Sequence, residues 1–167
     1  MAFIPEGKPV SASSIVLTQV MLPEDTNSAG NVHGGTIMKL ADNAAFVVAS
    51  RHCRTNVVTA SVDRIDFLAP VYIGDLLILH ARLNWTGHAS MEIGIKIDSE
   101  DLFSGKVRHV ATALLTFVSL DEKGRPKPVP PLILETEEDR RIFQEAAERA
   151  RIRKETRKRG KSQKDKK

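Results

Sequence analysis

One segment, residues 34–51 (GGTIMKLADNAAFVVASR), constrains the fold more than any other part of the chain. It holds no proline and is rich in Ala, Leu and Met, which favours a helix. Apolar residues occur on almost every side of that helix, so most of its surface must be buried. A sheet that carries the helix on its concave face buries it well, and few other arrangements do. The segment therefore predicts one long helix covered by a sheet.

Runs of β-branched and alternating residues on both sides of this segment supply the sheet. One run precedes the helix, at 14–21, and four follow it, at 57–67, 76–85, 90–98 and 107–120. In 90–98 the alternation puts four large apolar residues on one face. A group of prolines at 126–131 then ends the sheet, and a charged helix begins near Glu137. The order predicts an α+β fold with a C-terminal exit helix, and one covered face predicts an oligomer with shared sheets.

Length and cysteine content indicate one domain in a reducing compartment. The 167 residues suffice for a single core, and the one cysteine, Cys53, permits no internal disulfide. No signal peptide is recognisable, and no apolar run reaches the roughly 20 residues that span a bilayer. We expect a cytoplasmic protein with no membrane partner. The predicted parts are a flexible N-terminus (1–13), the main domain (14–134), a C-terminal helix (135–156) and a disordered basic tail (157–167).

The basic charge of the chain is concentrated at its end. Residues 149–167 hold eleven Lys or Arg and two acidic residues, whereas the formal net charge of the whole chain is only +4. The main domain is therefore mildly acidic. A nucleic-acid arm would need aromatics or a defined fold, so nucleic acid is not an expected partner. The first arginines of this stretch could instead meet phosphate groups.

A polar group within the apolar helix suggests chemistry. Burying the carboxylate of Asp42 costs several kcal/mol unless it has partners, although it could also face outward as part of a polar strip. The helix starts at Gly34 and Gly35, where free backbone N–H groups can hold a developing oxyanion. A polar loop with Asn27 precedes it. These groups form a candidate active site, and the scattered histidines and lone cysteine show no metal-ligand spacing.

The pattern Asn27-x-x-Gly30-Asn31-x-x-Gly34-Gly35-x-Ile37-Met38-x-x-x-Asp42 resembles the signature of the hotdog-fold acyl-CoA thioesterases. The nearest branch resembles the cytosolic acyl-CoA thioester hydrolases and their bacterial relatives. The similarity continues through 58–63, 67–70, 74–75, 90–93 and 116–118, and covers roughly residues 14–153. It implies the hotdog fold, an antiparallel sheet wrapped around one long helix. The implied reaction, in fatty acid metabolism, hydrolyses acyl-CoA to free fatty acid and coenzyme A without a cofactor, a metal or a catalytic serine.

The resemblance also implies roles for individual positions. Asp42 would act as general base or nucleophile, and Asn27 would orient water or the carbonyl. The amides of Gly34 and Gly35 would polarise the thioester carbonyl. Contacts with coenzyme A are implied at Ala60, Ser61, Val62, Ala89, Ser90, Met91 and Arg151.

The spacing of the catalytic groups favours a site shared between subunits. Gly34 and Asp42 are eight residues apart, or roughly 12 Å along one helix. Reacting atoms must lie within about 3–3.5 Å of each other. We therefore expect a homodimer in which Asn27 and the glycine amides come from one subunit and Asp42 from its partner. The family suggests a trimer of such dimers, a hexamer.

Other functions remain open at this point. An acyl-carrier-protein thioesterase or a dehydratase of the same fold is one, although a dehydratase normally pairs a histidine with its carboxylate. A module that senses acyl-CoA without turnover is another, and it would not need Asp42. The adjacent His52 and Cys53 do not indicate a thiol nucleophile, because adjacent side chains usually point apart and a reactive sulfur requires an electropositive niche.

Overall fold

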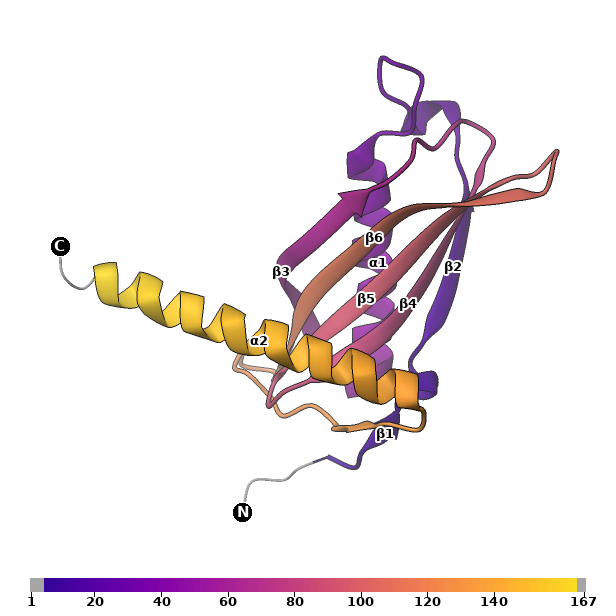
Figure 1. The fold of residues 1–167 in the computed structure, drawn as a ribbon. Helices are drawn as coiled ribbons and strands as arrows, with labels where there is room; N and C mark the ends of the chain where they lie inside the picture. Colours follow the sequence, from indigo (N-terminus) through magenta and orange to yellow (C-terminus); the bar gives the residue numbers. More distant parts are fainter. Residues whose placement is uncertain (1–4, 165–167) are drawn as a thin grey trace.

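The structure, a computed structural model, describes residues 5–164, with side chains described for residues 5–157. Its centre is the helix α1 (Gly34–Cys53), around which a five-stranded antiparallel sheet curves (Figure 1). The strands are β2 (Ile15–Val20), β3 (Asn56–Phe67), β4 (Leu76–Thr86), β5 (Ser90–Asp101) and β6 (Lys106–Leu120). Their order in the sheet is β2-β4-β5-β6-β3. This arrangement confirms the predicted α+β fold.

Alternating apolar residues on the strands form the core against α1. In β5, Met91, Ile93, Ile95 and Ile97 are all buried, as their alternation predicts. Their neighbours across the β5–β6 ladder are equally apolar: Ile93 pairs with Leu115, Ile95 with Ala113 and Ile97 with Ala111. The small alanines of β6 let the helix lie close to the sheet.

Burial of α1 is less complete than its composition predicts. The residues that face the sheet, among them Ala44, Ala45 and Val48, have no exposed surface. Met38 and Phe46, however, are 40% and 49% exposed. A single sheet covers only one side of a helix, so one face of α1 stays open within a single chain.

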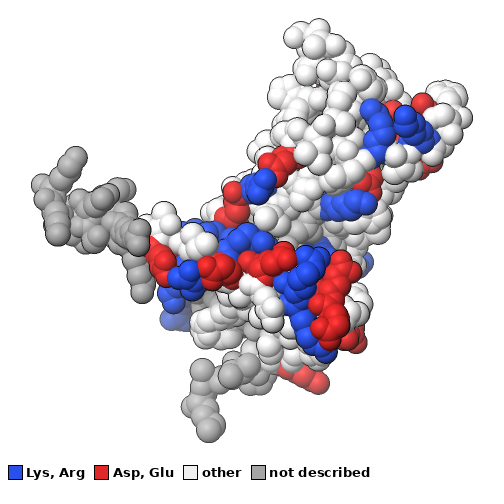
Figure 2. Space-filling model, in the orientation of Figure 1, with Lys and Arg blue, Asp and Glu red and all other residues white. Residues whose placement is uncertain are grey.

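The second helix, α2 (Glu137–Lys164), crosses the outer face of the sheet, opposite α1 (Figure 1). Lys and Arg alternate with Asp and Glu on the face of α2 visible in Figure 2. The helix continues through residues 157–164, a stretch for which the sequence predicts a disordered tail; residues 165–167 lie outside the described part. Lys, Arg and Glu are good helix formers, and pairs such as Arg151–Glu155 stabilise successive turns.

The segment before β2 also contains regular structure. Within the N-terminus predicted as flexible, β1 (Lys8–Pro9) pairs with β7 (Leu132–Ile133), and a 3-10 turn, η1 (Val10–Ala12), follows. The Lys8 ammonium donates to the carbonyl oxygen of His52 at 2.7 Å, and Ser13 is fully buried. Residues 8–13 thus take up regular structure because the distant segment β7 supplies a partner that a local pattern does not reveal. Residues 1–4 lie outside the described part.

Among the described helices, none is long and apolar enough to cross a membrane.

Candidate active site

The carboxylate of Asp42 lies on the side of α1 that faces β3. Its Oδ1 accepts a hydrogen bond from the hydroxyl of Thr59 on β3, at 2.7 Å. Beside it is an apolar cavity of about 240 Å³. The lining side chains come from α1, β3 and β6: Met38, Lys39, Ala41, Asp42, Val62, Ile65, Ala113 and Leu115. One carboxylate oxygen is thus held by a hydroxyl, while the other can accept a proton. Sequence reasoning missed Thr59, whose only signal is its place in the 58–63 motif.

Asn27 lies in the loop that leads into α1. Its side-chain oxygen accepts hydrogen bonds from the backbone amides of Ala29, at 2.9 Å, and Asn31, at 3.3 Å. The loop is anchored at its end, where the amide of Val32 donates to the carbonyl of Val71 at 2.8 Å. These contacts fix the orientation of the exposed Asn27 side chain. Its side-chain NH₂ group is then directed to donate away from the loop.

The first turn of α1 offers one of the two predicted glycine amides. The Gly35 amide donates to Nδ1 of His33, the N-cap residue, at 2.9 Å. That amide is therefore engaged in capping, and the Gly34 amide is the one left at the helix N-terminus to meet a substrate oxygen. The ring of Phe67 lies over Gly34, where an added Cβ would come within 3.4 Å of it. His33 is thus the capping residue of α1.

The two ends of the candidate site are separated along α1. The helix runs without interruption from Gly34 to Cys53, so Asp42 follows Gly34 by roughly 12 Å of axial rise. Thr59 and the apolar cavity lie at the Asp42 end, and Asn27 lies at the Gly34 end. A single thioester carbonyl cannot contact both ends within one chain, because reacting groups must approach within about 3–3.5 Å.

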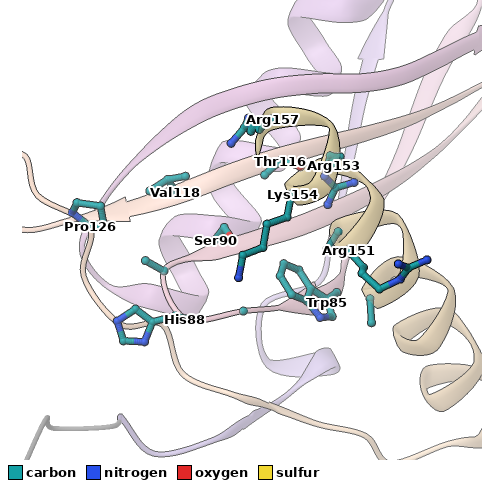
Figure 3. A pocket seen from close by; sticks show the side chains of 14 residues that line it. Trp85, His88, Ser90, Thr116, Val118, Pro126, Arg151, Arg153, Lys154 and Arg157 are labelled. Carbon is teal, nitrogen blue, oxygen red and sulfur yellow. The ribbon is translucent and has the colours of Figure 1, made fainter. Parts of the chain in front are cut away.

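A larger cavity of about 1150 Å³ lies on the other face of the sheet, beneath α2. Ala89, Ser90 and Arg151, three of the predicted coenzyme A contacts, line it together. Its walls also include Trp85, His88, Thr116 and the basic residues Arg153, Lys154 and Arg157 (Figure 3). The basic side chains come from α2, whereas His88 and Pro126 lie at the opposite end. The cavity joins an apolar floor to a cationic rim.

The remaining predicted contacts lie elsewhere. Val62 lines the cavity beside Asp42, and Ser61 donates to Asp63 at 2.7 Å. Ala60 is exposed on β3. The side chain of Met91 is fully buried on the α1 side of the sheet, 3.7 Å from the sulfur of Cys53. A ligand could therefore meet position 91 only through its backbone.

Arg151 is already engaged in ion pairs on its own helix. Its guanidinium contacts Glu148 and Glu155, each at 2.6 Å. The hydrogen bond with Glu148 raises the pKa of Arg151 above its ordinary value. A phosphate would have to compete with these two exposed carboxylates.

A buried carboxylate that sequence reasoning did not single out lies next to this cavity. Glu92 of β5 has no exposed surface, and its oxygens accept bonds from Arg149 at 2.6 and 3.1 Å and from Arg153 at 3.1 Å. The amide of Asn84 adds a contact at 3.2 Å. The hydrogen bond with Glu92 raises the pKa of Arg149. The signal in the sequence is an acidic residue between the apolar residues Met91 and Ile93, near the start of β5.

His52 and Cys53 do not form a reactive pair. Burial raises the pKa of Cys53 to about 11, so its sulfur remains protonated at neutral pH. A ring nitrogen of His52 lies 2.8 Å from the carbonyl oxygen of Pro130, and burial lowers the pKa of this histidine. The residues are therefore structural. Within the described part of the chain, no three His, Cys, Asp or Glu side chains are grouped to hold a metal ion.

Comparison with known proteins gives a consistent result. The model of the thioesterase superfamily matches residues 29–102. The chain is 41% identical over 150 residues to an uncharacterized acyl-CoA thioester hydrolase of Bacillus subtilis, a match that covers 90% of this chain and 87% of that one. It superposes on a hexameric acyl-CoA thioesterase with a TM-score of 0.87 and 36% identity, covering 91% of this chain and 97% of the other.

The chain is also similar to a solved acyl-CoA hydrolase from Staphylococcus aureus in complex with butyryl coenzyme A, coenzyme A and coenzyme A disulfide. The TM-score is 0.85 with 36% identity, over 93% of this chain and 94% of that one. Further structures of the S. aureus enzyme carry alanine in place of an aspartate, an asparagine or a threonine.

Proposed function

The chain belongs to the thioesterase superfamily, in its branch of hotdog-fold acyl-CoA thioesterases, and from this premise we propose how it hydrolyses acyl-CoA to a free acid and coenzyme A. The observation that carries the proposal is the carboxylate of Asp42, oriented by Thr59 beside an apolar cavity. Asp42, Asn27 and Thr59 are of the same residue types as those replaced by alanine in the S. aureus enzyme.

In this mechanism Asp42 acts on water. Thr59 donates to Oδ1 at 2.7 Å, which leaves Oδ2 to take a proton from a water molecule as its oxygen attacks the thioester carbonyl. The carbonyl oxygen becomes an oxyanion, which the Gly34 amide at the helix N-terminus stabilises. The C–S bond then breaks, the oxyanion re-forms a carbonyl, and the leaving thiolate of coenzyme A takes the proton from Asp42, whose carboxylate is regenerated. Asn27 orients the carbonyl or the water.

We propose that the two ends of the site meet across a dimer. Apolar side chains that would contact a second copy remain exposed near Asp42: Met38 and Phe46 on α1, and Val58 and Val62 on β3. The strand β3 lies at the edge of the sheet, so its outer side can pair with another strand. A second chain placed there brings its own Asn27 and Gly34 toward Asp42. The hexameric assembly of one similar thioesterase supports an oligomer built from such dimers.

The cavity under α2 is the proposed place for the nucleotide part of coenzyme A. Its cationic rim, to which Arg151, Lys154 and Arg157 contribute, suits phosphate groups. Arg151 would exchange its exposed partners Glu148 and Glu155 for a phosphate. We expect Arg151→Ala to raise KM for acyl-CoA with little change in kcat. A cytoplasmic location, the compartment in which a free Cys53 persists, is part of this proposal.

Thiol release from acyl-CoA substrates of two to eighteen acyl carbons tests the function directly. The isosteric variant Asp42→Asn should lose about 10²–10⁴ in kcat, the usual contribution of a general base, and still bind coenzyme A. Asn43→Ala, at the exposed neighbouring position of the same helix, is the matched control and should keep full activity. A wild-type chain that binds acyl-CoA without releasing thiol would identify a sensor instead. Equal activity of wild type and Asp42→Asn would remove Asp42 from the mechanism.

A further inference from the structure

The apolar side chains with which the outer helix α2 packs are few and lie mostly near its start. Among its side chains described through residue 157, only Ala146 and Asp139 are buried. The neighbouring Ala147 and Ala150 are small and line the large cavity. Near the start of the helix, Ile142 and Phe143 are partly buried. Farther along, burial of one alanine contributes under about 1 kcal/mol, so apolar contact does little to fix this part of the helix. Polar contacts therefore hold the part of α2 that lies over the cavity.

Two ionic contacts attach α2 to the sheet. At its start, the carboxylate of Asp139 forms an ion pair with the guanidinium of Arg82 on β4, at 2.7 Å. The same carboxylate accepts a hydrogen bond from the backbone amide of Thr136, at 3.0 Å, and so caps the helix. Further along, Arg149 and Arg153 both reach Glu92 of β5. The attachments are ten to fourteen residues apart, about 15–21 Å along the helix. They therefore determine its direction across the sheet.

The contact at Glu92 also sets the rotation of α2 about its axis. Arg149 and Arg153 are one turn apart and so project from the same face of the helix. Arg149 binds both oxygens of Glu92, which is a directional arrangement. Lys154, which follows Arg153, and Arg157, one turn further along, line the cavity. A roll of the helix that broke the Glu92 contact would carry these two cations away from the cavity.

The attachment is part of a larger polar network beneath the cavity. Across the strands, Glu92 is paired with Trp85 on one side and Thr116 on the other, and both line the cavity. The hydroxyl of Thr116 donates to Asp63 of β3, whose carboxylate lies 3.4 Å from Arg153. Ser61 donates to Asp63 as well. The network thus links α2 to β3, β5 and β6.

The fold would lose much of its stability if Glu92 lost its partners. Its side chain is completely buried, and four hydrogen bonds from three residues satisfy it. Breaking a buried ion pair by removing one partner is strongly destabilising, because the other charge is left uncompensated. A shift of α2 that separates Arg149 and Arg153 from Glu92 would therefore be unfavourable.

We propose that Glu92 is a positioning residue for substrate binding, which holds α2 so that its cationic rim lies over the cavity for the nucleotide part of coenzyme A. The proposal rests on the function proposed above. Glu92 does not line the cavity, so any effect it has on the substrate passes through Arg149, Arg153 and the helix they belong to. Asp42 and the apolar cavity beside it lie on the other side of the sheet, so we expect the reaction step itself to be unchanged.

Two substrates separate this role from a purely structural one. Acyl-CoA carries the nucleotide, whereas the acyl thioester of N-acetylcysteamine has the same thioester without it. For Glu92→Gln we expect KM for acyl-CoA to rise about tenfold with kcat retained, and kcat/KM for the short thioester to stay at the wild-type value. The fluorescence of Trp85, the only tryptophan of the chain, should shift because α2 moves above it. Glu122→Gln, in an exposed turn, is the matched control and should change neither value.

Asp63→Asn gives a second measurement if Glu92→Gln does not fold. Asp63 does not line the cavity and holds Arg153 from the β3 side, so KM for acyl-CoA should rise about threefold. An unchanged KM in a folded variant, or an equal loss of activity on both substrates, would overturn the proposal. If wild type hydrolyses neither substrate, the proposed function fails. The affinity for coenzyme A, measured by calorimetry in wild type and Glu92→Gln, then still decides the role of Glu92, and equal affinities would overturn it.

Discussion

Subunits that carry Asn27→Ala and subunits that carry Asp42→Ala should restore activity when they assemble together. The reason is the roughly 12 Å of helix between Gly34 and Asp42, which is several times the distance over which reacting groups act. If each site takes Asn27 from one chain and Asp42 from another, each group is intact in about half of the sites of an equal, random mixture. About a quarter of the sites then hold both, so activity should reach about a quarter of the wild-type value. The fraction is the same for a dimer and for a trimer of dimers.

Co-expression of the two variants with different affinity tags, followed by a thiol-release assay, measures this fraction. Each variant alone should be inactive. A co-assembly of equal amounts of wild type and Asp42→Ala should keep about half of the activity, because every chain carries Asn27 and half of the chains carry Asp42. Failure of the mixed assemblies to recover any activity, while this control keeps half, would show that Asn27 and Asp42 of the same chain form each site. The shared-site proposal would then be wrong.

Three further predictions concern residues around the helix. Thr59→Val removes the hydroxyl that orients Asp42, and kcat/KM in the thiol-release assay should fall about tenfold, or about 1.4 kcal/mol, as for one hydrogen bond to a charged group. Cys53→Ser should leave kcat unchanged. Alkylation of wild-type Cys53 should stay slow until the pH nears its pKa of about 11. Fast alkylation at pH 7 would contradict a buried, protonated sulfur. Burial lowers the pKa of His52 from its ordinary value of 6.5, so below pH 6.5 the unfolded chain binds a proton at this position more readily than the folded chain does. The free energy of unfolding should therefore fall as the pH drops below 6.5. In thermal melts, the melting temperature of His52→Gln should depend less on pH in this range.

The central helix and the strands could be predicted from the sequence because their signals are local. A proline-free apolar segment becomes α1, and alternating residues such as Ile93, Ile95 and Ile97 become the buried face of β5. The position of Asp42 on this helix and its distance from Gly34 follow from residue spacing alone. These features require only the helix and strand periods, which each short segment carries by itself.

Contacts between distant segments could not be read in the same way. The pairing of β1 with β7 orders a terminus that has no strong pattern, and the hydrogen bond from Thr59 to Asp42 joins residues on different elements. The Gly35 amide, expected to meet the substrate, is instead capped by His33, because a side-chain rotamer decides which acceptor reaches it.

The sequence by itself determined that one apolar helix lies in a curved sheet and carries a carboxylate eight residues from a glycine pair. Only the tertiary structure decided which residues orient that carboxylate and how the charged outer helix is held. Glu92 illustrates the reason, since its chain neighbours are apolar and its partners Arg149 and Arg153 are more than fifty residues away. Once the fold removes these charges from water, each one needs the other to compensate it. The attraction between them depends on their distance in space, which the spacing along the chain does not give.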